Sequence, residues 1–318
     1  MTAPLDSILS KRLIFVTGKG GVGKTTVSTA LGLLAARRGL RTLICEVEPK
    51  GEVSRFFGIK SGGFVPVNVA ENLDVMEMST EAALYEYLKL YLRLPIPVRL
   101  TPLAKTFDFV ANAAPGVREI LVVGKLCYEV RERHYDVVLA DASSSGHIVS
   151  QLSSPQGVGD LFPIGLVRDQ TDWMLEILAD REQTGICLVA TAEETPIEES
   201  LELNQRLKEQ TVVSLVAAIV NKVIPSVFSN LERTTFEGLS ALLDAGVELG
   251  ALDGLANLIE ATRLWSSLGE RQESLIQRLR SALPKQTPFA VVPTIPGVHV
   301  GLSVVTEVAE TLEVELSL

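Results

Sequence analysis

The feature that most constrains this 318-residue chain is a glycine-rich stretch near its N-terminus, FVTGKGGVGKTT, from Phe15 to Thr26. Gly18 to Thr25 satisfies the pattern GxxxxGK[ST], with a short apolar run before it and a segment of helical character after it. Glycines let successive backbone N–H groups converge on phosphate oxygens, and the helix N-terminus adds the positive end of its dipole. The sequence therefore predicts a P-loop, a strand–loop–helix unit that binds nucleotide phosphates.

Two lysines lie in this loop, although phosphate binding needs only one. Lys24 is expected to pair with the β- and γ-phosphates, Thr25 to hold Mg²⁺ and Thr26 to reach the α-phosphate. Lys19 would point along the loop surface, away from these phosphates, where it could neutralise a nucleotide held by a second subunit. The alternative is an exposed lysine on a mobile loop. The nucleotide-binding candidates in this loop are Gly18, Lys19, Gly20, Gly21, Val22, Gly23, Lys24, Thr25 and Thr26.

Short β-branched runs alternate with longer segments of helical periodicity along the rest of the chain. This alternation predicts an α/β fold with a doubly wound, mostly parallel sheet of about seven or eight strands and right-handed crossovers. Thr26 to Arg38 is expected to form a helix that Gly39 ends, and Thr195 to cap a helix that runs to about Gln210. Strands are expected at Leu13–Val16, Thr42–Cys45, Leu73–Met76, Asp136–Ala140, Ile186–Ala190, Leu215–Val220 and Phe289–Val292.

Two regions interrupt this alternation inside what we expect to be a single domain, residues 1–318. Residues 80–134 are interpreted as a helical insertion, and residues 229–283 as a helical hairpin before the last strand. The insertion begins with a Tyr- and Leu-rich stretch, Thr80 to about Thr106. This stretch is either a contact for a client or membrane protein, or a helix packed on the protein's own core.

Composition limits the partners. The net charge is −10 and no run of Lys and Arg forms a basic patch, which argues against nucleic acid and against an anionic membrane surface. No uninterrupted apolar stretch reaches about 20 residues, and the N-terminus lacks the apolar core of a signal peptide. We therefore expect no direct membrane insertion and a cytoplasmic location. Cys45, Cys127 and Cys187 form no CxxC pair and are expected to be buried and free.

The loop GKGGVGKTT resembles the deviant Walker A motif of the ArsA, MinD and nitrogenase-iron-protein class of P-loop ATPases. In that class the first lysine crosses a dimer interface to the partner's ATP, and the resemblance implies this role for Lys19. The absence of a CxxC pair and of a second P-loop distinguishes the chain from the zinc-clamped eukaryotic targeting factor and from the duplicated arsenite-pump subunit.

A second stretch, Tyr135 to Asp141 followed by ASSSGH and Leu152–Pro155, is similar to the ArsA and guided-entry (tail-anchored protein targeting) ATPases. The resemblance implies that Asp141 holds Mg²⁺ through a water and that Gly146 supplies a hinge and an N–H near the γ-phosphate. Ala142 and serines stand where the family carries Thr and Pro, which implies a different motion of this switch. With CEVEPKG and GKLCYEVRERHYD, the pattern is most similar to actinobacterial ArsA-type ATPases, which often occur as paired paralogues.

The resemblance assigns four further positions. Glu48, before Pro49, stands where the family carries the Asp that orients the attacking water, and its extra methylene implies slow hydrolysis. Glu46 would help to hold the metal. For these two acids the alternative is solvated loop charges. Asn221 matches the residue that reads adenine, or else is an ordinary strand-to-loop turn, and Pro293 matches a loop beside the base.

The resemblance as a whole implies a dimeric ATPase switch that binds ATP and Mg²⁺, with Lys19, Glu48 and Asp141 as its catalytic residues. The dimer would be a homodimer or a heterodimer with a paralogous ATPase, and its motion would act on a client or membrane-protein partner. One alternative is a non-hydrolysing subunit that scaffolds an active paralogue. Another is a ParA- or MinD-like positioning ATPase, against which the acidic C-terminal segment from Thr306 to Glu315 argues.

Overall fold

The core of the fold is one eight-stranded sheet with the strand order β3-β4-β2-β5-β1-β6-β7-β8. The computed structural model describes residues 3–60, 62–92, 116–225, 230–245, 254–295 and 301–317. Neighbouring strands pair in parallel except β3 and β4, which confirms the predicted doubly wound, mostly parallel α/β fold. The strands are β1 (Leu13–Gly18), β2 (Thr42–Glu46), β3 (Val67–Ala70), β4 (Leu73–Glu77), β5 (Val137–Ser144), β6 (Thr184–Thr191), β7 (Leu215–Val223) and β8 (Phe289–Pro293).

Burial explains which strands the sequence predicts. Every residue of β1, β2 and β6 is buried, as expected for parallel strands covered by helices on both faces, and such strands appear as continuous apolar runs. The sequence analysis missed β3. It is a four-residue edge strand, partly exposed and antiparallel to β4, so it lacks the buried apolar run on which the other predictions rested.

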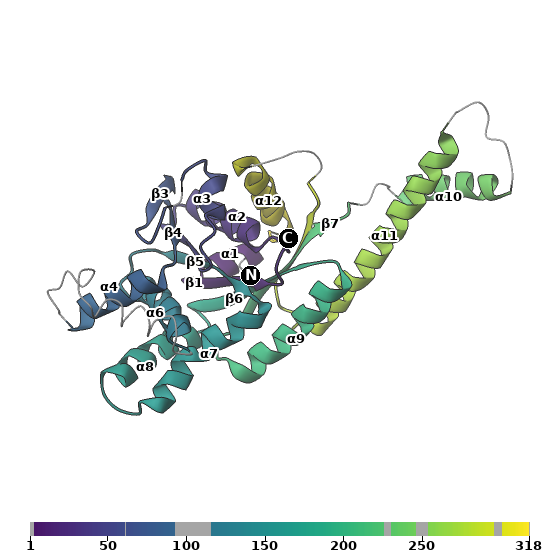
Figure 1. Ribbon diagram of the computed structural model, residues 1–318. Helices are drawn as coiled ribbons and strands as arrows, with labels where there is room; N and C mark the ends of the chain where they lie inside the picture. The colour runs from purple at the N-terminus through teal and green to yellow at the C-terminus, as the bar shows by residue number, and fades with distance from the viewer. Residues whose placement is uncertain are drawn as a thin grey trace.

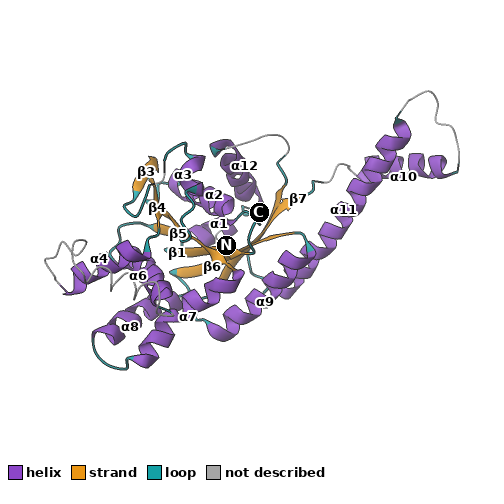
Figure 2. Cartoon of the chain, in the orientation of Figure 1, coloured by secondary structure: helices purple, strands orange, loops and turns teal. Residues whose placement is uncertain are grey.

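Helices cover both faces of the sheet (Figures 1 and 2). The first face carries α1, α2, α3 and α12, and the backbone N–H of Leu5 donates to the carbonyl of Leu316 at 3.0 Å, which joins the two ends of the chain. The second face carries α6, α7, α8, α9 and the C-terminal part of α11. The helices are α1 (Pro4–Leu9), α2 (Lys24–Arg37), α3 (Glu52–Phe56), α4 (Thr80–Leu92), α6 (Val117–Arg131), α7 (Ser145–Leu161), α8 (Leu166–Ala179), α9 (Glu194–Gln210), α10 (Asn230–Asp244), α11 (Leu255–Ala282) and α12 (Leu302–Glu315).

Helix ends agree with the sequence at one predicted position and differ at another. Gly39 follows the C-cap of α2 with φ +79°, the left-handed conformation that the sequence predicts there. Thr195, by contrast, is not the N-cap of α9: the cap is Glu193, whose extended backbone ends the connection from β6. Thr195 and Pro196 therefore lie inside the first helical turn, where a missing N–H costs no helical hydrogen bond.

The two irregular regions are helical wherever the structure describes them. Residues 80–134 contain α4 and α6, and the Tyr- and Leu-rich stretch is described only as α4, since residues 93–115 lie outside the described part. Ala83 and Leu88 of α4 are buried, whereas Leu90 is 43% exposed. Residues 229–283 contain α10 and α11, and Figure 1 shows α10 and the first turns of α11 projecting away from the sheet.

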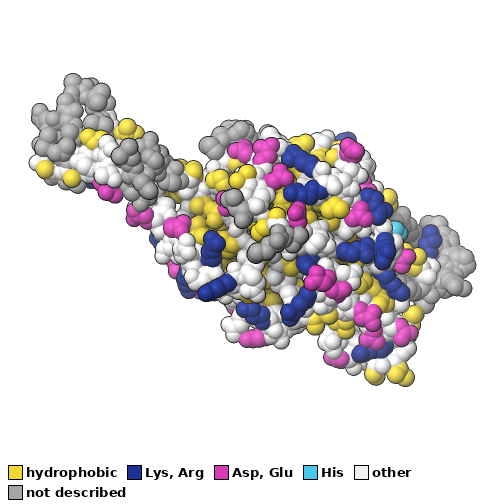
Figure 3. Space-filling model, turned by 180° about the vertical axis from the view of Figure 1, so that it is seen from behind, with side chains coloured by type: hydrophobic (Ala, Val, Ile, Leu, Met, Phe, Trp, Pro, Cys, Tyr) yellow, Lys and Arg dark blue, Asp and Glu magenta, His cyan; other side chains and the backbone are white. Residues whose placement is uncertain are grey.

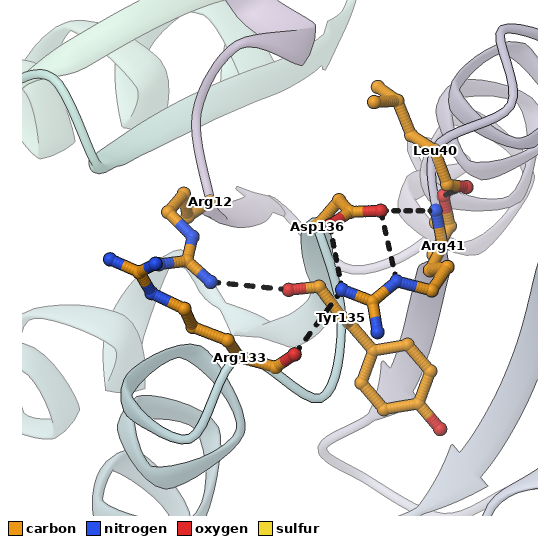
Figure 4. Close-up of polar contacts among 7 residues, drawn as sticks. Arg12, Leu40, Arg41, Arg133, Tyr135 and Asp136 are labelled. Atoms are coloured by element: carbon orange, nitrogen blue, oxygen red, sulfur yellow. Dashed lines mark hydrogen bonds and ion pairs between the residues drawn. The ribbon is translucent and has the colours of Figure 1, made fainter.

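Polar contacts join strands at the end of the sheet where β2 and β5 begin (Figure 4). Asp136, just before β5, accepts bonds from the backbone N–H of Arg41 at 2.9 Å and from its guanidinium at 2.9 and 3.2 Å. The hydrogen bonds from Arg41 hold the pKa of Asp136 below its usual value. Arg12 reaches the carbonyl of Tyr135 at 3.3 Å. The P-loop lies at the opposite end of the strands, so these contacts stabilise the sheet and are not part of the candidate site.

Cys45, Cys127 and Cys187 are buried and free, as predicted. Burial raises the pKa of the Cys187 thiol to about 12, which keeps it protonated and unreactive. Among the described helices, none combines the length and apolar character that crossing a membrane requires.

One buried charge cluster joins α4 to α6 and gives a prediction about stability. Lys125 donates to Glu129 at 2.7 Å and to Glu86 at 2.6 Å, and Lys125 and Glu129 are both buried. Lys125→Met removes the charge but keeps the stem, so it leaves the Glu129 carboxylate buried beside fewer partners. We expect a loss of about 3 kcal/mol in the free energy of unfolding, measured by urea denaturation.

Arg168→Met is the matched control, because Arg168 and Asp172 form the same i,i+4 spacing with side chains 35% and 45% exposed. An exposed pair of this kind contributes less than about 1 kcal/mol. Equal losses in the two variants would contradict the assigned role of burial.

Candidate functional site

The P-loop joins β1 to α2 at the carboxyl edge of the sheet, where the chain departs to opposite sides of β1, the position at which such folds bind ligands. Two of its glycines are required by close approach. A Cβ on Gly18 would lie 1.9 Å from the carbonyl oxygen of Val189, and a Cβ on Gly23, at φ +95°, would lie 2.3 Å from Nδ2 of Asn221. The loop is therefore seated tightly against β6 and β7.

Two side chains from the end of β7 hold the loop in place. Asn221 donates from Nδ2 to the carbonyl of Val22, and Lys222 donates from Nζ to the carbonyl of Gly21, both at 2.9 Å. Lys222 adopts φ +58°, a conformation that is uncommon for a residue with a side chain. In this arrangement the amide nitrogen of Asn221 faces the loop, so adenine recognition by Asn221 stays a prediction.

The predicted base-side loop begins next to these residues. Pro293, at the end of β8, is the register partner of Val223 on β7 and is exposed. The N–H of Thr294 donates to the carbonyl of Val223 at 2.7 Å. Pro293 and Asn221 thus lie at the same sheet edge, on neighbouring strands.

Asp141 and Thr25 form the centre of the site. Asp141 on β5 is buried, and its Oδ2 accepts a hydrogen bond from Thr25 Oγ1 of α2 at 2.8 Å. Its other oxygen, Oδ1, is buried without a hydrogen-bond partner among the described residues. Burial raises the pKa of Asp141 to about 7, against the opposing effects of Thr25 and Lys24. A buried carboxylate oxygen beside a threonine hydroxyl is a donor set that suits Mg²⁺.

Lys24, at the start of α2, has an ammonium that donates to the carbonyl of Lys19 at 3.3 Å. Burial lowers its pKa, and the charges of Asp141 and Glu48 oppose this effect. Lys24 thus lies within the electrostatic reach of both predicted catalytic carboxylates.

The two acids at the end of β2 and just after it have different surroundings. Glu46 is buried, and its carboxylate accepts hydrogen bonds from the backbone N–H groups of Gly51 at 3.0 Å, Glu52 at 2.7 Å and Val53 at 3.1 Å, which fastens α3 to β2. Metal binding by Glu46 would compete with these bonds. Glu48 is 42% exposed, with Oε2 3.6 Å from the ammonium of Lys50.

Lys19 lies on the far side of the loop and contacts α9. Its Nζ is 2.6 Å from Oε1 of Glu199, and Ser145 Oγ donates to Oε2 of the same carboxylate at 3.2 Å. Ser145 begins α7, and Gly146 lies exposed in the first turn of that helix. Two contacts of the loop were not predicted from the sequence. They are the ion pair between Lys19 and Glu199 and the hydrogen bond from Lys222 to the carbonyl of Gly21. Glu199 is one of several acids on α9, so nothing local distinguishes it.

These parts converge at one edge of the sheet. The N-terminus of α2, the glycine loop, the partly buried Lys24 ammonium and the buried Asp141 carboxylate lie close together, and these groups are suited to a polyphosphate with a divalent cation. The chemistry available is therefore phosphate binding with a positioned metal.

Comparison with known proteins agrees with this geometry. A family model described as "Anion-transporting ATPase" matches residues 11–165 and 164–237. The chain belongs to this family, the ArsA-type ATPases. ATPase BagA of Mycobacterium tuberculosis is 30% identical over 310 residues, 91% of this chain and 89% of that protein. ATPase get3 of Schizosaccharomyces japonicus is 31% identical over 153 residues, 46% of this chain and 44% of that protein.

The burial of Asp141 generates a prediction about pH. Its pKa rises from 3.8 to about 7 on folding, so between these values the folded chain binds a proton that the unfolded chain has released. The contribution of Asp141 to stability should therefore be greatest at the acid end and fall as pH rises from about 4 to about 7, by roughly 1 kcal/mol per pH unit.

Asp141→Asn removes the titrating group, so the difference in free energy of unfolding between wild type and variant isolates its effect. We expect this difference to fall across the window and to become constant above about pH 7, in urea denaturation without nucleotide or metal. Parallel curves for the two proteins from pH 4 to pH 7 would contradict the raised pKa.

Proposed function

We propose that this protein is an ATP-hydrolysing, Mg²⁺-dependent dimeric switch that acts on a client protein or a membrane partner. The observation that carries the nucleotide part is the Asp141–Thr25 pair beside the P-loop, with Oδ1 of Asp141 buried and available. Thr25 and Asp141 would hold Mg²⁺, which would neutralise charge on the phosphates. Family membership supports nucleotide binding as the common property.

Hydrolysis needs a carboxylate that orients the attacking water. Glu48 follows β2 at the same end of the sheet and is partly exposed. Its charge acts to raise the pKa of Lys24. We assign it this role, and we assign to Lys24 the stabilisation of the β- and γ-phosphates. Glu46 supports the same segment indirectly, because it fixes the start of α3 directly after Glu48 and Pro49.

Lys19 is the residue that we propose to contact a second subunit. Its ammonium pairs with Glu199 of α9, its side chain is 34% exposed, and it lies beside an open cleft of about 400 Å³. From there it would reach the nucleotide of a facing subunit, either an identical copy or a paralogue. ATP would then draw two subunits together and hydrolysis would release them.

An apolar region of the second face supports the client part of the proposal. A cavity of about 210 Å³ lies between α4, α6 and α8, lined by apolar side chains that include Leu121 and Met174. Next to it, the connection from α7 to α8 exposes Leu161 by 75%, Phe162 by 52% and Ile164 by 86%. Figure 3 shows hydrophobic side chains at this end of the molecule. Large apolar side chains exposed this close together in the chain are candidates for an interaction surface.

A matched pair of lysine variants tests the proposal. Lys24→Ala should weaken ATP binding by roughly 30- to 150-fold, since a hydrogen bond to a charged group contributes about 2–3 kcal/mol. Lys19→Ala should change binding by less than about threefold but reduce turnover by about 1000-fold, as loss of a cation supplied across an interface does. Titration with a fluorescent ATP analogue and phosphate-release assays measure the two effects. Normal hydrolysis by Lys19→Ala would refute the cross-subunit role.

Glu48→Gln should keep ATP binding and remove turnover, because the amide cannot accept a proton from water. The variant would then accumulate as an ATP-bound dimer, visible by light scattering as a doubling of mass that ADP does not produce. A monomer at every ATP concentration would count against the switch. Absence of turnover in the wild type, alone and with any paralogue, would instead favour a non-hydrolysing scaffold subunit.

A further inference from the structure

A single carboxylate on α9 contacts two segments that surround the phosphate site. Glu199 accepts the ammonium of Lys19 at 2.6 Å through one oxygen and the hydroxyl of Ser145 at 3.2 Å through the other. Lys19 belongs to the P-loop, and Ser145 is the first residue of α7, directly after the strand that carries Asp141. The Glu199 side chain therefore joins the P-loop to the start of α7.

The orientation of Glu199 sets it apart from the other acids of α9. Glu194 and Glu198 face α11, where Arg278 lies 3.8 and 2.5 Å from them. One residue further along the helix turns the side chain by about 100°, which points Glu199 toward the P-loop instead. Glu202 lines the same cleft as Glu199, but no described residue pairs with it.

The single ammonium of Lys19 cannot contact Glu199 and the nucleotide of a facing subunit at the same time. While it contacts Glu199 it stays within its own subunit, and a facing subunit's nucleotide must compete for it. The cleft beside the pair holds about 400 Å³ of open space, so the lysine stem can swing out without displacing a buried side chain. Both partners are about one-third exposed, so the pair is solvent-screened and readily exchanged.

We propose that Glu199 is a positioning residue that holds Lys19 within its own subunit and so opposes dimer closure until a triphosphate outcompetes it. The inference rests on the proposed dimeric switch. ATP offers Lys19 more negative charge than ADP does, so the exchange favours the ATP-bound dimer. When Lys19 leaves, Glu199 keeps only its contact with Ser145, so the same carboxylate links the position of Lys19 to the start of α7. Glu199 thus makes closure selective for ATP.

Glu199→Gln tests this, because the amide keeps the size and the hydrogen-bonding capacity of the side chain but loses its charge. Glu202→Gln is the matched control, an uncharged variant of the next acid in the same cleft. The first readout is the rate at which acetic anhydride modifies Lys19 in protein free of nucleotide, measured by peptide mass spectrometry against the exposed Lys60. A purely structural role for Glu199 would not change this rate selectively.

We expect Lys19 modification to rise about fivefold in Glu199→Gln and to stay unchanged in Glu202→Gln, since a partly exposed pair is worth up to roughly that factor. Added salt at about 1 M should raise the rate in the wild type and not in Glu199→Gln. Equal rates in wild type and Glu199→Gln would overturn the inference, whatever the oligomeric state.

The second readout is sedimentation velocity with Mg²⁺ and either ATPγS or ADP. A dimer contains two such pairs, so Glu199→Gln should lower the dissociation constant of the ATPγS dimer by roughly tenfold and should permit dimers with ADP. An unchanged dissociation constant in Glu199→Gln, with a wild type that dimerises, would overturn the role of Glu199 alone. A wild type that never dimerises would overturn the proposed switch, and the inference with it.

Discussion

The site depends on the burial of the Asp141 carboxylate. Taking a carboxylate out of water is unfavourable, and here one hydroxyl, from Thr25, satisfies only one of its two oxygens. Folding thus leaves this group with its pKa raised to about 7 and with Oδ1 buried and without a hydrogen-bond partner among the described residues. A bound cation would relieve this unfavourable burial. The burial that costs stability is thus the same feature on which the proposed metal site rests.

The position of that carboxylate follows from sheet register. Val16 of β1 pairs with Asp141 of β5, and Glu46 of β2 pairs with Asp141 from the other side. Three neighbouring strands therefore bring the P-loop, the Asp141 carboxylate and the segment after β2 to one end of the sheet. Glu46 fixes the start of α3, whereas Glu199 contacts Lys19 and the start of α7, so two carboxylates hold segments beside the P-loop. Buried Glu46 makes the more permanent of these attachments.

The sequence predicts much of this arrangement because its strongest signals are local. The P-loop, the end of α2 at Gly39 and the buried runs of β1, β2 and β6 follow from glycine geometry and from apolar strands covered on both faces. The edge strand β3 and the true cap of α9 do not. β3 is short and partly exposed, so it lacks a buried apolar run, and Glu193 is not among the residue types that usually cap a helix. The roles of Glu199 and Lys222 are likewise set by tertiary contacts across about 180 and 201 residues.

The contacts of Lys19 and Lys222 also explain why a loop with two lysines and four glycines can stay ordered. Lys222 and Asn221 bind the carbonyls of Gly21 and Val22, which fixes this part of the loop against β7. Lys19 has no such carbonyl partner and instead makes a screened, one-third exposed ion pair. Side-chain hydrogen bonds from β7 therefore hold the Gly21–Val22 part of the loop, and Lys24 bonds the carbonyl of Lys19, whereas the side chain of Lys19 is held only by an exchangeable ion pair. This division of contacts is what a loop needs if it must bind its own phosphates firmly and a neighbour's transiently.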